Sequence, residues 1–449
     1  MQPAITASLI FVLLIVNLAA LTQLNKRLTI HPEILRKILH VSMGCVCLGL
    51  TWVFSRQKEV IVLAIACIIL LILIKYIRFL KNQLGSPLNL VNRNTYGEIY
   101  FTLGVFSTYL LAEGDHFLFL LPVAILTFSD SSAALSGVFF GKRTYTTPDD
   151  TKTVLGSSVF FISSIAISIF VMVLMTDLSI EKIVLVSVIL GLVLMLIEAV
   201  SWRGMDNLLI PVVCFTILKS HLIYPISTLH TNLLVFVVLS GLLLYWQRHC
   251  RFRDEVINMS ILYCYACWVY AGSSWMLIAI AVLVIYPYLY SNEEKVSNYP
   301  YNSSAAFSLL GTGVLFLLIE QMFKVPHSFY IYTLSFSIHL SLIKLISMRS
   351  RFPGYNYFGL SLLSSLKIFT IMFFIYWFIA DKADVMLVLI SLPVLLLSNG
   401  IFLITQKKLN AYHSDAKRWF VQAILTCGIS VSLLVLLEFV LPYDWNNYI

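Results

Sequence analysis

The sequence predicts an all-α membrane protein, a polytopic transmembrane helical bundle with about 14–16 membrane spans. Three observations predict this class: 59% of the 449 residues are hydrophobic, only 12% are charged, and the mean hydropathy is +0.90. An ordinary soluble domain has about 25% charged residues, and a single globule could not bury this much apolar surface. Aromatic residues make up 14% of the chain, which excludes a disordered protein.

Apolar stretches close to the length of a bilayer crossing follow one another along the whole chain. A helix needs about 20 mostly apolar residues to cross the hydrocarbon core, so we expect one helix from each stretch. Segment 208–220 is short and contains Pro211, and it could instead enter and leave the membrane on one side. The sixteen expected spans lie near residues 4–22, 38–54, 59–74, 99–113, 117–140, 155–176, 183–199, 208–220, 229–247, 257–271, 273–290, 304–322, 327–347, 358–380, 385–405 and 420–441.

The distribution of basic residues predicts the orientation. The net charge is +8, and with the N-terminus outside, the inner loops hold 22 Lys and Arg residues against six in the outer loops. Cytoplasmic loops of membrane proteins are enriched in Lys and Arg, so we attribute the positive charge to topology and expect no nucleic-acid partner. A basic loop near 248–255 separates residues 1–247, which carry dense polar motifs, from residues 248–449, which carry few.

The first polar segment opens the second expected span. Glu33, Arg36, Lys37, His40 and Gly44 fall at i, i+3, i+4, i+7 and i+11, which places them on one face of a helix. The basic pair alone would serve as an anchor whose side chains reach the interface. A histidine one turn deeper is harder to explain in that way, so this face is also a candidate ligand site.

Two later segments each place one carboxylate in a helix. Glu98 begins the fourth expected span, where a carboxylate also suits the helix dipole. Asp130 lies deeper within its span, and an ionisable residue inside the membrane is costly and indicates function. Small residues at 131–134, 136 and 137 leave room for a ligand, although they would equally allow close helix packing.

A basic loop between two expected spans is a candidate phosphate site. Free backbone N–H groups at a helix N-terminus bind anions, and basic side chains beside them add positive charge. The spacing is not that of a P-loop, and a helical hairpin with a basic loop would explain the same residues by packing alone. The candidate phosphate-binding residues are Arg36, Lys37, Lys142, Arg143, Lys152, Thr153, Gly156 and Ser157.

The fourth polar segment, residues 198–211, offers oxygen ligands around a short inner loop. Mg²⁺ in proteins takes one or two carboxylates together with phosphate oxygens of a substrate. Asp206 also stands where a helix N-cap is expected, which is the structural alternative for it. The candidate metal ligands are Asp130, Glu198, Asp206 and Asn207.

Together these four segments supply what phosphoryl transfer requires. That chemistry depends mostly on positioning and charge neutralisation, so it needs bases for the phosphates and acids for a divalent ion. All four segments lie in the first half of the chain and on one predicted side of the membrane.

In order and spacing, the four segments resemble the motifs of the phytol kinase and dolichol kinase family, which is related to phosphatidate cytidylyltransferases. Glu33-x-x-Arg36-Lys37-x-x-His40-x-x-x-Gly44 resembles the opening motif, and Gly97-Glu98 with Leu103-Gly104 resembles the second. Asp130-x-x-Ala133-x-x-x-Gly137-x-x-x-Gly141-Lys142 with Lys152-Thr153-x-x-Gly156-Ser157 is similar to the nucleotide segment. Glu198 with Gly204-x-Asp206-Asn207-x-x-x-Pro211 is similar to the last motif, so the match covers residues 30–215.

The resemblance implies a membrane kinase that transfers a phosphoryl group from CTP, or another nucleoside triphosphate, to the hydroxyl of an isoprenoid alcohol such as phytol, dolichol or polyprenol, with Mg²⁺. It departs from the family at Thr153 and Leu155, which replace a serine and a glutamate. His40 or Asp130 would accept the alcohol proton, and Lys152 would hold phosphate. The catalytic candidates are His40, Glu98, Asp130 and Lys152.

Two other functions stay open at this point. A cytidylyltransferase acting on a lipid phosphate would use the same residues but release pyrophosphate. A transporter of a lipid-linked substrate would need polar residues near the membrane midplane in both halves, and the second half has only scattered ones. For the kinase we expect a bacterial inner membrane, a cytoplasmic active site and membrane lipids as partners.

Overall fold

The computed structural model is almost entirely helical, which confirms the predicted all-α class. It describes residues 3–28, 30–80, 96–147, 151–250, 252–289, 303–352, 354–380, 384–405 and 416–440. Within these residues, 13 helices are long and apolar enough to cross a membrane. The chain is therefore an integral, multi-pass membrane protein.

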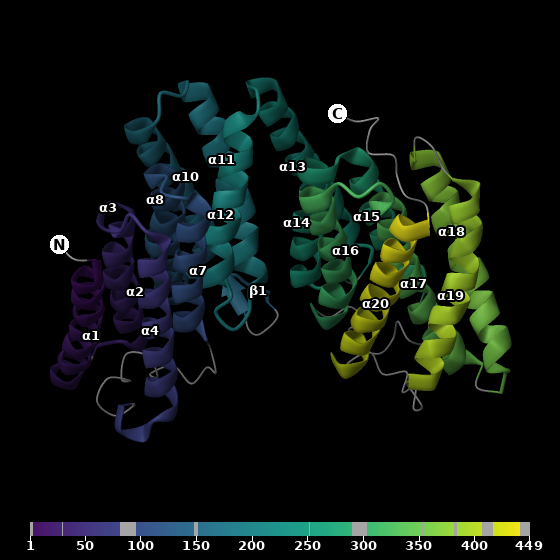
Figure 1. Ribbon diagram of the computed structural model, residues 1–449, viewed down its shortest axis with the longest axis horizontal. Coiled ribbons are helices and arrows are strands. Elements are labelled where there is room, and N and C mark those ends of the chain that lie inside the picture. Colours follow the sequence, from purple (N-terminus) through teal and green to yellow (C-terminus); the bar gives the residue numbers. More distant parts are fainter. Residues whose placement is uncertain are drawn as a thin grey trace. The chain divides into compact units, whose positions relative to one another are not determined.

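The chain forms two compact units, Met1–Leu234 and Val235–Ile449, with the boundary inside a helix and upstream of the basic loop at which we divided the sequence. In the N-terminal unit, α7 packs against α4 and α12, and α10 packs against α9 and α11 (Figure 1). The elements up to the boundary are α1 (Pro3–Arg27), α2 (Pro32–Leu48), α3 (Leu50–Val53), α4 (Gln57–Tyr76), α7 (Gly97–Ala112), α8 (His116–Ala124), the π-helix η1 (Ile125–Ser129), α9 (Asp130–Phe140), β1 (Thr144–Thr146), β2 (Thr151–Thr153), α10 (Val154–Met175), α11 (Ile180–Val200), α12 (Asp206–Ile223) and α13 (Ile226–Gln247).

The C-terminal unit is built around one central helix, α17. This helix contacts α15, α16, α18, α19 and α20, and its span is 89% buried, the largest buried share among the 13 candidate spans. The elements of this unit are α14 (Asp254–Ala271), α15 (Ser273–Ile285), the 3₁₀-helix η2 (Tyr286–Tyr288), α16 (Ser303–Phe323), α17 (Ser328–Arg351), α18 (Tyr357–Ile379), α19 (Val385–Thr405) and α20 (Ala416–Val440).

Helices occur at all sixteen positions where the sequence predicts a span. Thirteen have the length and hydropathy of a full crossing, and α7, α14 and α15 are the three helices at predicted positions that do not. Segment 208–220, one of the sixteen expected spans with a re-entrant path as its alternative, lies within the continuous helix α12, which contains Pro211 and is long enough to cross. A proline inside a transmembrane helix is tolerated because neighbouring helices satisfy the freed backbone groups.

Local signals explain where several helices begin. Pro32 occupies the first turn of α2, where the missing N–H costs nothing, and the Asp115 side chain accepts the backbone N–H of Leu118 at the start of α8. Thr153 caps α10 in the same way, by accepting the N–H of Gly156 at 3.1 Å. This cap sets the point at which the chain turns from the β1–β2 hairpin into the membrane.

Two glycines allow the helices that carry the polar motifs to approach closely. A Cβ at Gly44 of α2 would collide with the Thr127 side chain of η1, and one at Gly104 of α7 would collide with the backbone oxygen of Asn207 in α12. Transmembrane helices commonly pack through small residues, since these let the backbones meet. The glycines of the polar motifs therefore have a packing role, and they bring α2 to η1 and α7 to α12.

Replacing Gly104 with alanine is expected to destabilise the N-terminal unit by about 1–3 kcal/mol, because the backbone of α12 must move to admit the methyl group. A lowered melting temperature of the purified protein in detergent would show this. Gly241→Ala is the matched control, since a Cβ at Gly241 meets nothing within 4 Å. Equal melting temperatures for the two variants would contradict the close contact of α7 with α12.

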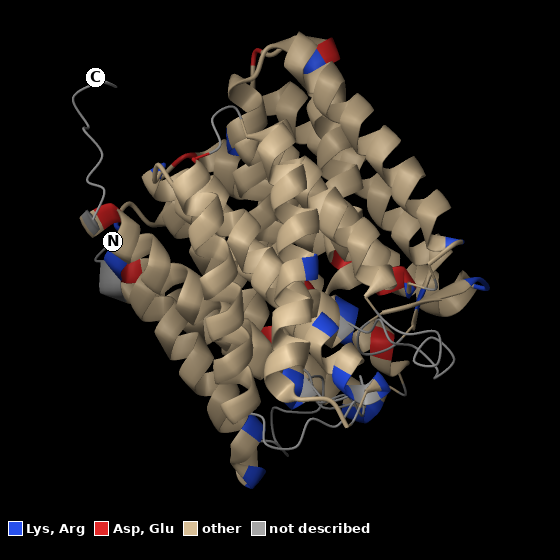
Figure 2. Cartoon of the chain, turned by 90° about the vertical axis from the view of Figure 1, so that its right-hand side faces the viewer, with Lys and Arg blue, Asp and Glu red and all other residues tan. Residues whose placement is uncertain are grey.

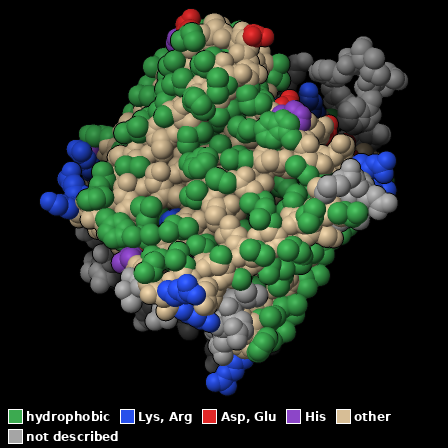
Figure 3. Space-filling view, turned by 90° about the vertical axis from the view of Figure 1, so that its left-hand side faces the viewer, with side chains coloured by type: hydrophobic (Ala, Val, Ile, Leu, Met, Phe, Trp, Pro, Cys, Tyr) green, Lys and Arg blue, Asp and Glu red, His purple; other side chains and the backbone are tan. Residues whose placement is uncertain are grey.

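Charged residues are sparse along the middle of the helices and occur mainly near the helix ends (Figure 2). The outer face of the N-terminal unit is largely covered by apolar side chains (Figure 3). Exposed apolar residues on this unit include Leu9, Val12 and Val16 of α1 and Ile65 and Ile69 of α4. Such a surface would be unstable in water and suits contact with lipid tails.

Candidate active site

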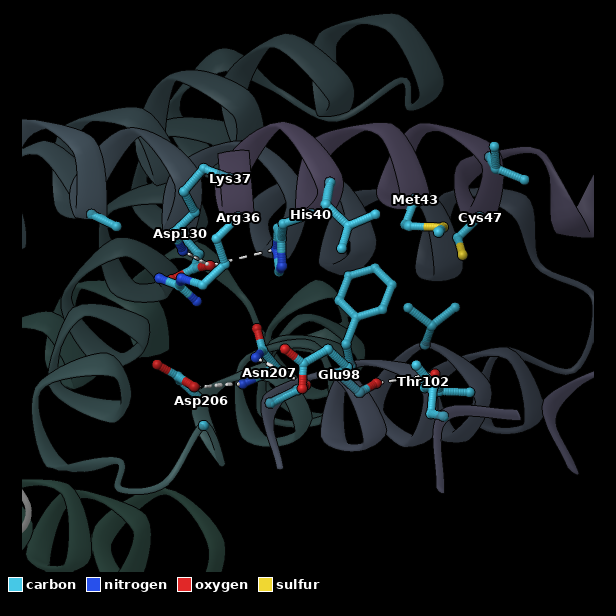
Figure 4. Close-up of a pocket in the computed structure, with 18 of the residues that line it drawn as sticks. Arg36, Lys37, His40, Met43, Cys47, Glu98, Thr102, Asp130, Asp206 and Asn207 are labelled. Carbon is cyan, nitrogen blue, oxygen red and sulfur yellow. Dashed lines mark hydrogen bonds and ion pairs between the residues drawn. The ribbon is translucent and has the colours of Figure 1, made fainter. Parts of the chain in front are cut away.

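The N-terminal unit encloses a cavity of about 530 Å³ that is lined by residues of all four polar motifs. Figure 4 shows Arg36, Asp130 and Asp206 at one end of this cavity, and Met43 and Cys47 of the same helix as Arg36 toward the other. The cavity therefore has an ionic end and an apolar end. We call these the ionic end and the tail chamber below.

The ionic end contains a buried ion pair between α2 and α9. Lys37 Nζ donates to Asp130 Oδ2 at 2.5 Å, and the two side chains are only 2% and 10% exposed. Their partnership compensates the large cost of placing either charge alone in the membrane. Since both contacts of Asp130 use Oδ2, its Oδ1 is the oxygen that can face a ligand.

His40 lies one turn further along α2 and completes this cluster. Its Nε2 is 3.0 Å from the carbonyl oxygen of Leu126 and 3.4 Å from Asp130 Oδ2, and its ring stands edge-on to Phe101. A carbonyl oxygen only accepts, so Nε2 must carry the hydrogen. Nδ1 is then the nitrogen of the neutral ring that can accept a proton.

The π-helix η1, Ile125–Ser129, directly precedes Asp130 and connects α8 to α9 without a break. A π-turn inside an α-helix changes the face that later residues present, and such turns are frequent at functional sites. The Leu126 carbonyl that accepts His40 belongs to this turn. The irregular turn thus presents both a carbonyl and Asp130 to α2.

Arg36 lies at the ionic end and is held by its own helix. Its guanidinium contacts the carboxylate of Glu33 with Nη2 at 2.5 Å and Nε at 3.2 Å. The Arg36 side chain is 38% exposed, against 2% for Lys37. Of Arg36 and Lys37, Arg36 is therefore the cation that an incoming anion can reach more easily.

A second cluster joins the hairpin to α11 and α12. Lys152 Nζ donates to Glu198 Oε1 at 2.6 Å and to the Glu198 backbone oxygen at 2.5 Å. It also lies 3.8 Å from Asp206 Oδ2. Burial alone would lower the pKa of the Lys152 ammonium, but the carboxylates of Glu198 and Asp206 outweigh it and raise this pKa above its ordinary value. Lys152 therefore stays charged at neutral pH.

The antiparallel hairpin β1–β2 positions Lys152. Tyr145 pairs with Lys152 across the strands, and its hydroxyl is 2.7 Å from the Ser157 hydroxyl in the first turn of α10. Thr153, Gly156 and Ser157 also line the cavity, so the N-terminus of α10 points its first turn toward the ionic end. Of the predicted phosphate-binding residues, Lys152, Thr153, Gly156 and Ser157 therefore lie together at this cavity. The backbone N–H groups of Val154 and Gly156 are already bonded, to the Arg143 carbonyl and to Thr153 Oγ1.

Two of the predicted phosphate ligands lie elsewhere. Lys142 and Arg143 are exposed, and neither lines the cavity. They precede β1, whereas Lys152 lies on β2, whose residues Thr151 to Thr153 all line the cavity. The other predicted site residues line this one cavity: Arg36, Lys37, His40, Glu98, Asp130, Lys152, Thr153, Gly156, Ser157, Glu198, Asp206 and Asn207.

A tight turn brings the fourth motif against the second. Gly204 adopts φ +84°, and a Cβ there would lie 2.6 Å from the Cα of Gly97. Asn207 Nδ2 donates to the Gly97 carbonyl at 3.1 Å, beside Glu98 in the first turn of α7. Glycine is needed at position 204, because the backbone there is left-handed and a Cβ would collide with the Gly97 backbone.

The four candidate metal ligands, Asp130, Glu198, Asp206 and Asn207, all line the cavity. Among the described residues, no group of three His, Cys, Asp or Glu side chains could hold a metal ion by itself. Glu198 Oε2 and Asn207 Oδ1 are nevertheless buried oxygens without a hydrogen-bond partner in the described part of the chain. Oxygens of this kind, together with phosphate oxygens, form the usual Mg²⁺ site.

The tail chamber is a feature that the sequence motifs did not indicate. Apolar side chains of α1, α2, α4 and α7 line it, and none belongs to a recognisable pattern, because these helices carry apolar residues on their exposed faces as well. The residues include Phe11, Leu14, Leu18, Met43, Val46, Leu63, Ala64, Cys67, Leu71, Phe101 and Val105.

No protein-family model, no curated protein and no solved structure matches this chain significantly.

Proposed function

We propose that the N-terminal unit is a membrane-embedded lipid kinase. It transfers a phosphoryl group from CTP, or another nucleoside triphosphate, to the hydroxyl of an isoprenoid alcohol. The observation that carries this proposal is the cavity that joins an ionic end to an apolar chamber. A substrate that fills both ends has a polar head and a long apolar tail.

The proposal assigns the alcohol tail to the tail chamber. The hydroxyl then lies at the ionic end, near His40 and Asp130. Apolar side chains favour an apolar chain there, since its removal from water is favourable and no polar group is left unpaired. The exposed apolar faces of α1 and α4 adjoin lipid, so the alcohol reaches the site from the membrane.

The triphosphate is assigned to Arg36, Lys152 and the first turn of α10. Arg36 is partly exposed, Lys152 is positively charged, and the first turn of α10 lies at the positive end of the helix dipole. These groups neutralise the charge that phosphoryl transfer spreads over the phosphate oxygens. We place this end of the cavity on the cytoplasmic side of a bacterial inner membrane, where nucleotides are available.

In the proposed reaction the alcohol oxygen forms a bond to the γ-phosphorus, the bond to the bridging oxygen breaks, and the nucleoside diphosphate leaves. The alcohol proton goes to Nδ1 of His40 or to Oδ1 of Asp130. Oδ2 of Asp130 already accepts from Lys37, so this carboxylate suits orientation or binding of Mg²⁺ better than proton transfer. His40 is therefore our preferred proton acceptor.

Asp130, Glu198, Asp206 and Asn207 would hold Mg²⁺ with the phosphates, and the ion would supply further neutralisation of their charge. The unpartnered oxygens of Glu198 and Asn207 support this assignment. Glu98, in the first turn of α7, is assigned to shaping the site beside them.

The experiment that tests the function uses the purified protein with Mg²⁺, CTP labelled at either the α- or the γ-phosphate, and a panel of isoprenoid alcohols. The kinase transfers only the γ-label to the lipid. When a lipid phosphate is supplied in place of the alcohol, transfer of the α-labelled CMP group to give a CDP-lipid, with release of pyrophosphate, would instead identify a cytidylyltransferase. Absence of both products with every nucleotide would refute the enzyme assignment.

Filling the tail chamber is expected to impair use of long alcohols. Ala64 is 6% exposed and lines the chamber. Ala64→Phe should weaken transition-state binding of a long alcohol by about 1–3 kcal/mol, which lowers kcat/KM for that alcohol roughly 5- to 150-fold. The adjacent Ile65 is 52% exposed and faces away, so Ile65→Phe is the matched control. Kinetics with alcohols of increasing length measure the effect, and equal losses in both variants would contradict the chamber.

A further inference from the structure

A row of polar side chains follows one face of α20 in the C-terminal unit. Arg418, Gln422, Thr426 and Ser430 recur every four residues, so they lie above one another on the helix. Arg418 is 3% exposed and the other three are fully buried. The helix packs against α16 and α17, so this row lies in the interior of the unit.

None of these four side chains has a hydrogen-bond partner in the part of the chain that the structure describes. The unpartnered atoms are all three guanidinium nitrogens of Arg418, both amide atoms of Gln422, and the hydroxyls of Thr426 and Ser430. Arginine cannot become neutral by losing a proton, so burial leaves an uncompensated charge. An ionisable residue of this kind within a membrane bundle indicates a ligand of opposite charge.

The surroundings of Arg418 favour a phosphate group as that ligand. Its guanidinium lies over the Trp419 ring, 4.7 Å from the centroid, and the Ser308 hydroxyl donates to the Trp419 carbonyl at 2.7 Å. Arg418 is in the first turn of α20, at the positive end of the helix dipole. The guanidinium of Arg418 and the amide of Gln422 together match the several acceptor oxygens of a phosphate.

We propose that the C-terminal unit holds a phosphate-binding site at the start of α20, formed by Arg418 and Gln422. The site is separate from the cavity of the N-terminal unit and does not depend on the function proposed for it. The phosphate belongs either to the headgroup of a lipid phosphate or to a free anion, and both sources present the same oxygens to the guanidinium.

Thermal unfolding of the full-length protein in nanodiscs tests this site. One arm adds inorganic phosphate to discs of neutral lipid, and the other replaces part of the neutral lipid with phosphatidic acid. Both arms are repeated with Arg418→Met and with the matched control Lys417→Met, which removes a neighbouring but exposed cation. A rise in melting temperature in at least one arm is expected for the wild-type protein and for Lys417→Met, and no rise for Arg418→Met.

A rise only with phosphatidic acid identifies the lipid headgroup, and a rise with inorganic phosphate identifies a site open to the free anion. The site is refuted if the wild-type protein shifts in neither arm, or if Arg418→Met shifts as much as the wild type. Should Arg418→Met fail to fold, Gln422→Leu takes its place. That variant keeps the charge, removes one donor and is expected to show a smaller shift, so an undiminished shift would then refute the site.

Discussion

Replacing Asp130 with asparagine is expected to lower the rate of phosphoryl transfer about 10²- to 10⁴-fold. The substitution removes the carboxylate that contacts Lys37 and His40 and that we assign to the metal and the acceptor hydroxyl. Transfer of γ-labelled phosphate to the alcohol by purified protein measures this effect. Asp177→Asn, in an exposed loop outside the cavity, is the matched control and should retain full activity.

Loss of folding must be separated from loss of chemistry in this variant. Asp130→Asn leaves the buried ammonium of Lys37 without its anion, which costs about 3–5 kcal/mol in measured cases. The double variant Lys37→Met with Asp130→Asn removes both charges, so we expect its melting temperature to recover while the activity stays low. Activity near the wild-type level in the folded double variant would mean that the pair has only a structural role.

Replacing Lys152 with alanine is the second large effect that we expect, a loss of about 10²- to 10³-fold in kcat/KM for the nucleotide. Lys152 is the cation between Glu198 and Asp206, and its removal leaves these two carboxylates facing the incoming phosphates. The carboxylates and the phosphates are all negatively charged and repel one another, so both nucleotide binding and the rate of phosphoryl transfer should decrease. Steady-state kinetics at varied CTP measure both contributions.

Lys142→Ala is the matched control for Lys152, because the two lysines flank the same hairpin. Lys142 is exposed and lies outside the lining of the cavity, so its variant should behave like the wild type. The sequence motif assigns both lysines to phosphate. Equal losses at the two positions would therefore favour a phosphate site on the outside of the hairpin over one in the cavity.

The ionic end pairs most of its cations with carboxylates. The ion pairs are Glu33 with Arg36, Asp130 with Lys37, and Glu198 with Lys152. These pairs make the charges tolerable in a membrane protein, since an isolated charge there is costly. In the proposed kinase, the polyphosphate would share these cations with the carboxylates, and a divalent ion that binds the carboxylates would make the cations available to the phosphates.

The sequence alone determined the class and most of the helices. Sixteen helices lie where the hydropathy predicts spans, because a bilayer imposes one length and one polarity on every crossing. It also indicated the candidate site residues. A charged residue within an apolar helix stands out in any one-dimensional pattern, and Asp130 and His40 were found in this way.

Only the tertiary structure decided which of these residues meet. Lys37 and Asp130 are 93 positions apart, and helix packing through Gly44 determines their contact, which no local pattern encodes. Likewise, Lys152 lies on β2 and lines the cavity, whereas Lys142 precedes β1 and lies outside the lining. Side chains that face lipid and side chains that line the tail chamber are both apolar, so hydropathy could not distinguish Ala64 from Ile65. The tail chamber exists only because four helices pack together around it.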